Sequence, residues 1–235
     1  MLNNNLLALI ITFLLSLAWL RFNDFAAHRG WIGNRLSRKI IHIGTGPIFV
    51  VCWLLFNDAS MSRYLAALVP LIITVQFVLV GLGIIQDEAA VKAMSQTGEP
   101  REILRGPLFY GIIFVVLTTL YWKDSPIGIV ALMLMCGGDG LADILGRRYG
   151  NLQLPWNPGK SWMGSFGMFI GGWIMALVVI GVYVAAEVFI RPMSLYVIPI
   201  TIIAIVGTFI ESLPLKDVDN ITVTLTAVVL GQFLF

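Results

Sequence analysis

The chain is dominated by long apolar runs that are separated by short polar segments. A membrane-spanning helix needs about 20 mainly apolar residues, and the sequence offers eight candidates, of which the last is short. They cover residues 6–20, 40–56, 64–85, 107–122, 126–146, 165–189, 195–210 and 221–235. We therefore expect an all-α, polytopic integral membrane protein with seven or eight transmembrane helices.

The composition supports this fold class. The 235 residues are 58% hydrophobic and only 12% charged, with a mean hydropathy of +0.90, which is too little polar surface for a water-soluble globule. The loops are too short to hold a soluble catalytic domain, and nothing indicates a nucleic-acid partner. A single domain over residues 1–235 is expected, with Cys52 and Cys136 as packing residues and Gly167 and Gly171 as a close helix-packing pair.

Lys and Arg alternate strongly between successive loops, with 12 of the 15 falling on one side of the predicted membrane. The other side carries only Arg63, Lys123 and Arg191. By the positive-inside rule the rich side is cytoplasmic, which places the N-terminus outside. The first apolar run lacks a preceding Lys or Arg and a small-residue cleavage site, so we expect this span to be retained.

Two acids lie inside the predicted span 126–146. If that segment is one helix, Asp139 and Asp143 are four residues apart and share a face. An Asp at the centre of a membrane helix costs about 2.5 to 3.5 kcal/mol, so both need compensation. A divalent cation such as Mg²⁺, held with substrate phosphates, is one solution. The alternative is an ion pair of Asp143 with Arg147, which leaves Asp139 bonded to a neighbouring helix.

The next loop carries Lys160 and Ser161, followed by Gly164 and Ser165. It is not a Walker A loop, because the required first glycine is replaced by Leu154. A Lys and two hydroxyls that lead into a helix N-terminus still form a plausible phosphate site. The simpler interpretation is a Lys that reaches the membrane surface and a Ser that caps a helix.

Further polar groups flank other spans, and each has a structural interpretation. Arg38, Lys39 and His42 open the second span, where cations are common anchors. Near the final span lie Glu211, Asp219 and Asn220, and either of the last two could cap that helix. All these groups fall on the predicted cytoplasmic side, which suits a soluble, phosphate-bearing donor that meets a lipid acceptor.

Glu102 and Arg105, which precede Gly106 and Pro107, form one more polar pair on the same side. Three residues apart, they could form no more than an interfacial ion pair.

Taken in order, these residues resemble the phytol kinase branch of the polyprenol kinase family. The resemblance covers about residues 35–235, whereas residues 1–34 match nothing in particular. The pattern departs at Thr224, where we expected a proline. The matching stretches are Arg38-Lys39-Ile40-Ile41-His42 with Gly44, Glu102-Ile103-Leu104 followed by Gly106-Pro107-Leu108-Phe109-Tyr110, Cys136-Gly137-Gly138-Asp139-Gly140-Leu141-Ala142-Asp143, Lys160-Ser161-Trp162 with Gly164-Ser165, Glu211-Ser212-Leu213-Pro214, and Asp219-Asn220.

This resemblance implies a CTP-dependent kinase that phosphorylates the terminal hydroxyl of phytol, or of a related isoprenoid alcohol, to give phytyl phosphate for tocopherol synthesis. It also implies an active face on the cytoplasmic side, in the cytoplasmic or thylakoid membrane of a photosynthetic bacterium. Whether the acceptor is phytol, geranylgeraniol or farnesol stays open.

The resemblance leads to a hypothesis for each group at the site. Asp139 and Asp143 would hold Mg²⁺. The proton acceptor would be Glu211, Asp219 or His42. The alternative role of Glu211 or Asp219 would be to bind a second metal ion. The phosphates of CTP would be bound by Arg38, Lys39, Arg147, Lys160, Ser161, Gly164 and Ser165. Substrate-binding or structural roles would fall to Glu102, Gly106, Pro107, Tyr110 and Asn220.

Two other functions are compatible with parts of the pattern. A CTP-using lipid cytidylyltransferase would have a similar topology, but the His-Gly-Gly run typical of that family is missing here. A secondary transporter would also explain buried carboxylates, although it predicts inverted repeats and polar groups near the membrane midplane.

Overall fold

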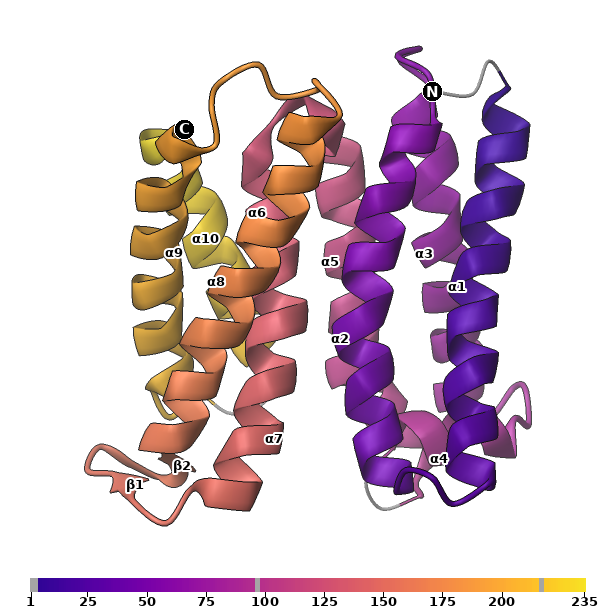
Figure 1. The fold of residues 1–235 in the computed structure, drawn as a ribbon. Helices are drawn as coiled ribbons and strands as arrows, with labels where there is room; N and C mark the ends of the chain where they lie inside the picture. Colours follow the sequence, from indigo (N-terminus) through magenta and orange to yellow (C-terminus); the bar gives the residue numbers. More distant parts are fainter. Residues whose placement is uncertain (1–3, 96–97, 216–217) are drawn as a thin grey trace.

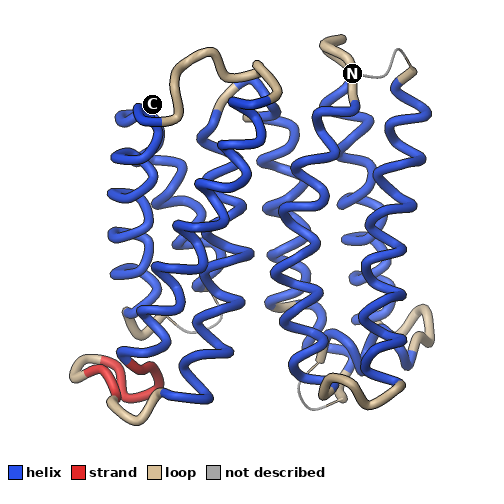
Figure 2. The backbone as a smooth tube through the Cα atoms, in the orientation of Figure 1, coloured by secondary structure: helices blue, strands red, loops and turns tan. Residues whose placement is uncertain are grey.

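The computed structural model describes residues 4–95, 98–215 and 218–235 as a helical bundle with one short β-hairpin (Figures 1 and 2). Within the described residues, six long and two shorter apolar helical segments run between the two ends of the bundle. Both chain termini lie at the same end (Figure 1). The elements are α1 (Asn5–His28), α2 (Asn34–Cys52), η1 (Trp53–Leu55), α3 (Ser62–Gly81), α4 (Glu88–Met94), η2 (Pro100–Leu104), α5 (Gly106–Leu120), η3 (Trp122–Asp124), α6 (Pro126–Met133), η4 (Leu134–Gly138), α7 (Asp139–Tyr149), β1 (Gln153–Leu154), β2 (Asn157–Ser161), α8 (Trp162–Ala185), α9 (Ser194–Ser212) and α10 (Asp219–Leu234).

The all-α membrane fold is confirmed. Within the described residues, six helical segments are long and apolar enough to cross a membrane, and two more, Lys39–Leu55 and Asp219–Leu234, are apolar but shorter. Each of the eight expected spans coincides with one of these passes. Whether seven or eight of them cross a bilayer is not decided by helix length.

The two ends of the bundle differ in the way the sequence predicts. The α1–α2 turn, α4, the hairpin and the α9–α10 connection lie at one end, called here the hairpin end (Figure 1). The other end, with both termini, is called the terminus end. There Arg63 pairs with Asp124 at 2.5 Å, and Lys123 pairs with Asp58 at 2.8 Å. The separation of Lys- and Arg-rich loops from poor ones is therefore confirmed, and the assignment of compartments stays a prediction.

The segment from α6 to α7 forms the centre of the bundle, and it is the most buried of the six long spans. It packs closely on α8, because glycines bring the two backbones together. A Cβ atom added to Gly167 would lie 2.7 Å from the main-chain oxygen of Leu141, and one added to Gly137 would lie 2.6 Å from that of Gly171. The expected packing role of Gly167 and Gly171 is confirmed.

The expectation that residues 126–146 form one helical span is confirmed, but the span is not α-helical along its whole length. The chain forms a π-helical turn, η4, between α6 and α7, and π-helical turns inside helices are frequent at functional sites. The turn ends on Gly137 and Gly138, which have a low intrinsic preference for regular α-helix. Because η4 ends directly before Asp139, its geometry determines where the Asp139 side chain points.

A second difference concerns the loop before α8. Strands β1 and β2 pair antiparallel there, with Gln153 opposite Ser161 and Leu154 opposite Asn157. From the sequence, this segment was expected to be a loop. The hairpin matters for the site because its second strand carries Lys160.

Candidate active site

The first group of polar side chains at the hairpin end surrounds Asp139 at the start of α7. Lys39 Nζ lies 3.2 Å from Asp139 Oδ2 and donates a hydrogen bond to it. His42 Nε2 lies 3.3 Å from the same oxygen, although it is not aligned for a hydrogen bond. Lys39 and His42 are three residues apart on α2, so both point to the same neighbour. The buried acid is thus compensated by two groups from another helix.

Asp143 continues this group one turn further along α7. Its Oδ1 lies 2.5 Å from Arg147 Nε, and its Oδ2 lies 4.0 Å from Lys39 Nζ. Lys39 therefore contacts both acids, which confirms that Asp139 and Asp143 share one face. This is the geometry that the alternative without a metal ion predicts: Asp143 is paired with Arg147, and Asp139 is bonded to a neighbouring helix.

Helices α2 and α7 can approach because Gly140 has no side chain. A Cβ atom added there would collide with the side chain of Ile43 on α2. This close approach is what brings Lys39 within reach of Asp139. The backbone of Arg38 lies on α2, but its side chain is outside the described part of the structure, so its predicted role stays untested.

Tyr110 on α5 packs against His42. The two rings lie 4.4 Å apart, and the Tyr110 hydroxyl donates to the main-chain oxygen of His42 at 3.0 Å. The same hydroxyl lies 3.2 Å from Cys136 Sγ in η4. Tyr110 therefore joins α5, α2 and the π-helical turn behind the acidic pair. Its surroundings give it a role in holding His42.

The second group of polar side chains surrounds Lys160 on β2. Lys160 Nζ lies 2.6 Å from Glu211 Oε1 and 2.6 Å from Asp219 Oδ2, and it also donates to the main-chain oxygen of Glu211. Burial lowers the pKa of Lys160, but the two carboxylates outweigh this and hold the pKa above its ordinary value. Lys160 is therefore a permanent cation that joins the end of α9 to the start of α10.

The hairpin is docked on the end of α9 by residues that the sequence analysis did not single out. Asn157 Nδ2 donates to the main-chain oxygens of Ser212 and Leu213, at 3.1 and 3.3 Å. Trp156 Nε1 donates to Ser212 Oγ at 3.1 Å. An Asn-Pro-Gly sequence signals a turn but says nothing about the helix on which the turn docks.

The start of α8 is largely satisfied by the protein itself. Ser161 Oγ accepts a hydrogen bond from the Gly164 main-chain nitrogen at 3.1 Å, and the Trp162 nitrogen donates to Leu152. Ser161 is thus the helix cap that the simpler interpretation predicts. Ser165 Oγ, by contrast, is buried and has no hydrogen-bond partner, so it is free to contact a ligand.

The remaining predicted residues lie at the same end. The expectation that Asp219 or Asn220 caps α10 was wrong: the cap position is Val218, without a side-chain bond, and Asp219 is drawn to Lys160 instead. Glu102 lies in η2, and Gly106 and Pro107 form the first turn of α5.

The two polar groups lie at the same end of the bundle, on residues from α2, α7, β2, α9 and α10 (Figure 1). Among the described residues, seven side chains have a buried polar atom without a hydrogen-bond partner, and three of these residues, His42, Ser165 and Asp219, are predicted site residues. Buried polar atoms normally have partners, so these three atoms could accommodate a polar ligand at the site.

The donor set suits a magnesium ion that is shared with phosphates. Mg²⁺ is usually held by one or two carboxylates together with substrate phosphates, and Asp139 with Asp143 supplies two carboxylates beside Lys39 and Arg147. A cage of three or more His, Cys, Asp or Glu side chains does not occur within the described ranges. Asp139 and Asp143 therefore suit a magnesium ion that is coordinated jointly by the protein and by phosphates.

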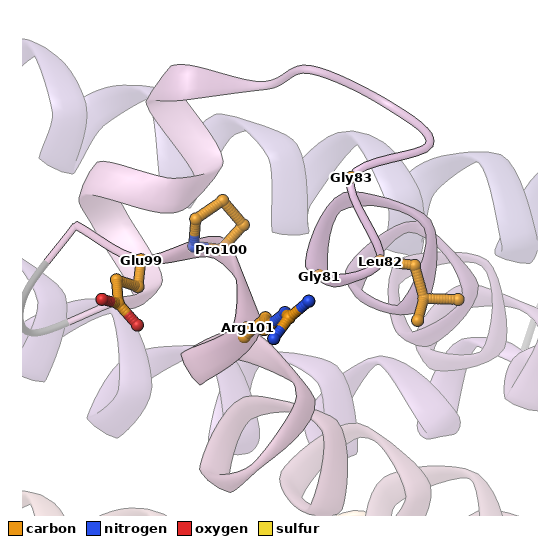
Figure 3. Close-up of a pocket in the computed structure, with 6 residues that line it drawn as sticks. All are labelled: Gly81, Leu82, Gly83, Glu99, Pro100 and Arg101. Atoms are coloured by element: carbon orange, nitrogen blue, oxygen red, sulfur yellow. The ribbon is translucent and has the colours of Figure 1, made fainter.

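Two cavities lie away from these charges. One of about 350 Å³ lies between the end of α3 and η2, and its lining includes Glu99 and Arg101 (Figure 3). The other, of about 430 Å³, lies at the terminus end beside Arg191. We therefore define the site by its converging charges and its unpartnered polar atoms.

Comparison with known proteins gives several close relatives. A probable phytol kinase of rice (Oryza sativa subsp. japonica) is 40% identical over 216 residues, which cover 91% of this chain and 68% of the relative. Phytol kinase 1 of Arabidopsis thaliana is 37% identical over 88% of this chain and 69% of the relative. Farnesol kinase of Arabidopsis thaliana is 38% identical over 96% and 74%, respectively. No family model and no solved structure matches.

All three of these relatives are described as chloroplastic. The expectation of a photosynthetic bacterium's membrane is therefore not confirmed. An integral membrane protein remains supported by the apolar helices.

Proposed function

Since the chain belongs to the phytol and farnesol kinase family, a group of lipid kinases, we propose that it transfers the terminal phosphate of CTP to the hydroxyl of phytol. The product is phytyl phosphate, which supplies tocopherol synthesis after a second phosphorylation. The observation that carries this proposal is the convergence of Lys39, Asp139, Asp143, Lys160 and Asp219 from four separate elements at one end of the bundle.

Phosphoryl transfer requires little covalent help from the protein. It requires that the donor and acceptor oxygens be held in line and that the charge on the phosphates be neutralised. In our proposal Asp139 and Asp143 hold Mg²⁺, which neutralises phosphate charge when bound. Lys39 and Arg147 lie beside these acids and bind the same phosphates, together with Arg38. Ser165 donates its free hydroxyl to a phosphate oxygen.

The acceptor reaches the site from the lipid phase. Helices α2, α5 and α8 all end or begin at the hairpin end (Figure 1), so an isoprenoid chain can lie along the bundle with its hydroxyl at the charged end. The alcohol proton must be accepted by a side chain at that end. His42, Glu211 and Asp219 are the candidates, and the first and last each retain an unpartnered atom.

Phytol is the proposed acceptor because most of the reported names are phytol kinases, but farnesol kinase is about as similar, at 38% identity against 37% for phytol kinase 1. Identity to relatives therefore does not separate a C20 from a C15 alcohol. The proposed CTP dependence rests on the family resemblance described above.

Purified protein in liposomes tests the proposal. The protein is incubated with Mg²⁺, CTP and, in separate samples, phytol, geranylgeraniol or farnesol, and the nucleotide and lipid products are quantified. We expect CDP and a lipid monophosphate in equal amounts, with phytol turned over fastest. Release of pyrophosphate would identify a cytidylyltransferase, and no turnover with any alcohol would refute the proposal.

A further inference from the structure

Lys160 lies at the centre of the second polar group, and among the described residues its ammonium bonds only to Glu211 and Asp219, which belong to that group. The sequence pattern suggested that Lys160 binds phosphate. We propose instead that Lys160 is a positioning residue that holds Asp219, and that Asp219 accepts the proton of the alcohol. This inference rests on the proposed kinase function and deepens it, because it separates the residues that bind the donor from those that act on the acceptor.

The hydrogen bonds of Lys160 explain why this residue is not assigned to phosphate binding. An ammonium group has three N–H donors, and Lys160 directs them to Glu211 Oε1, to the main-chain oxygen of Glu211 and to Asp219 Oδ2. All three donors are thus used within the protein. A phosphate oxygen could bind Lys160 only if one of these bonds were broken.

Lys39 offers the matched contrast within the same site. In the described part of the chain, its ammonium makes one hydrogen bond, to Asp139 at 3.2 Å, with Asp143 at 4.0 Å. Two donors therefore remain for phosphate oxygens, beside the acids that suit Mg²⁺. The two lysines have the same chemistry, but their hydrogen bonds assign them different tasks.

Asp219 has one carboxylate oxygen that can accept a hydrogen bond from a ligand. Its Oδ2 is fixed by Lys160, whereas its Oδ1 is buried and has no hydrogen-bond partner among the residues that the structure describes. An unpaired buried acceptor is costly, and the O–H of an alcohol is the donor that would satisfy it. Glu211 is less suited, because its side chain is only 10% exposed against 30% for Asp219.

The hairpin explains how Lys160 keeps this position. Asn157 and Trp156 bind the end of α9, and Ser161 caps α8 directly after Lys160. Lys160 is therefore anchored on both sides along the chain. Its ammonium joins α9 to α10 at a fixed place and fixes Asp219 there.

The chemical step balances as follows. The O–H bond of the alcohol breaks and its proton moves to Asp219 Oδ1, while the alcohol oxygen forms a bond to the terminal phosphorus of the nucleotide. The bond between that phosphorus and the bridging oxygen breaks, and CDP leaves with the electron pair. Asp219 then releases the proton to water.

The test measures nucleotide binding and turnover separately in the full-length protein in liposomes. The variants are Lys160→Met, Lys160→Arg, Asp219→Asn, the double variant Lys160→Met with Asp219→Asn, and Lys39→Met as the matched control. The Kd for CTP is measured without alcohol, and kcat is measured with saturating CTP and phytol. Thermal unfolding in detergent reports whether each variant is folded.

We expect Lys160→Met and Asp219→Asn to lower kcat at least about 100-fold and to change the Kd for CTP less than about threefold. The double variant should be no slower than Asp219→Asn, because the two residues act as a unit. Lys160→Arg should recover part of the lost kcat, and Lys39→Met should weaken CTP binding at least about tenfold.

The opposite pattern would overturn the inference. If Lys160→Met weakens CTP binding tenfold or more, Lys160 binds phosphate. If Asp219→Asn retains a third of the wild-type kcat, Asp219 is not the proton acceptor. This measurement remains decisive even if Lys160→Met fails to fold. A wild-type protein that binds CTP but phosphorylates no alcohol would refute the kinase function, while the CTP binding data would still decide the role of Lys160.

Discussion

The two ends of the bundle both carry buried or half-buried charges, but they arrange them differently. At the terminus end, Arg63 pairs with Asp124, and Lys123 pairs with Asp58. At the hairpin end, the charges are shared, since Lys39 contacts two acids and Lys160 contacts two more. Lys39 thereby keeps donors for a ligand, whereas Lys160 uses all of its donors within the protein.

Unpartnered atoms mark the same difference. At the terminus end, Asn5, Asn57 and Ser62 satisfy one another, and Lys123 also donates to the main-chain oxygen of Phe56. Among the described residues, Trp53 Nε1 near the terminus end and Ser165 Oγ and Asp219 Oδ1 at the hairpin end are buried without a partner, but of these three side chains only Asp219 also contacts a shared charge, that of Lys160. A buried charge alone therefore does not identify a site. Charges shared between distant segments, together with unsatisfied polar atoms, do.

The largest effect is expected for Asp139→Asn. The change removes the carboxylate that Lys39 and His42 surround, and with it the proposed hold on Mg²⁺, so kcat/KM should fall about 10²- to 10³-fold. The matched control at the terminus end is Asp58→Asn, which removes a mainly exposed carboxylate from its ion pair with Lys123 and should change kcat/KM less than about threefold. Steady-state kinetics with phytol and CTP compare the two. Equal losses would mean that the ends do not differ in function.

The packing that supports the acids can be broken next. Gly167→Ala places a Cβ atom 2.7 Å from the Leu141 main-chain oxygen, so α7 and α8 must separate. Such overpacking typically costs about 1 to 3 kcal/mol, and turnover should fall as well because Asp143 moves with α7. Gly181→Ala on the same helix is the control, since nothing lies within 4 Å of its added Cβ. A normal melting temperature and kcat for Gly167→Ala would contradict the glycine contact.

Lys123→Met, at the terminus end, should lower stability without lowering activity. The side chain is only 4% exposed and donates to Phe56 O at 2.8 Å, so its loss leaves a buried carbonyl oxygen unpaired. We expect a loss of about 1 to 3 kcal/mol in the free energy of unfolding and no more than a twofold change in kcat for the folded fraction. A large fall in kcat at an unchanged melting temperature would place function at this end too.

The smallest effect is expected for Ser161→Ala. This change removes the side-chain cap of α8 while the Lys160 ammonium keeps its partners. The loss of a cap costs about 1 kcal/mol, which thermal unfolding can detect. Because we assign Ser161 to capping and not to phosphate, the Kd for CTP should stay within about twofold. A tenfold weaker Kd would instead show that its hydroxyl binds the nucleotide.

Much of the fold follows from local sequence properties. Apolar runs predict the eight helical passes, and the alternation of Lys and Arg predicts which loops share an end. The spacing of Asp139 and Asp143 places them on one face, as the structure confirms. These features depend only on residues close in sequence, or on composition.

The remaining features depend on contacts between distant segments. Lys39 meets Asp139 across 100 residues, which one sequence does not reveal. The hairpin was missed because its strands are short and its docking partner, Ser212, lies 55 residues from Asn157. Asp219 looked like a helix cap for the same reason: its actual partner, Lys160, comes from this hairpin.

The most direct test of the account follows two labels in one reaction. CTP carrying a label on either the terminal or the first phosphate is supplied with Mg²⁺ and phytol to the wild-type protein and to Asp139→Asn in liposomes. The account predicts that only the terminal label enters the lipid, and that Asp139→Asn reduces this transfer at least about 100-fold. First-phosphate label in the lipid, or unchanged transfer by Asp139→Asn, would contradict it.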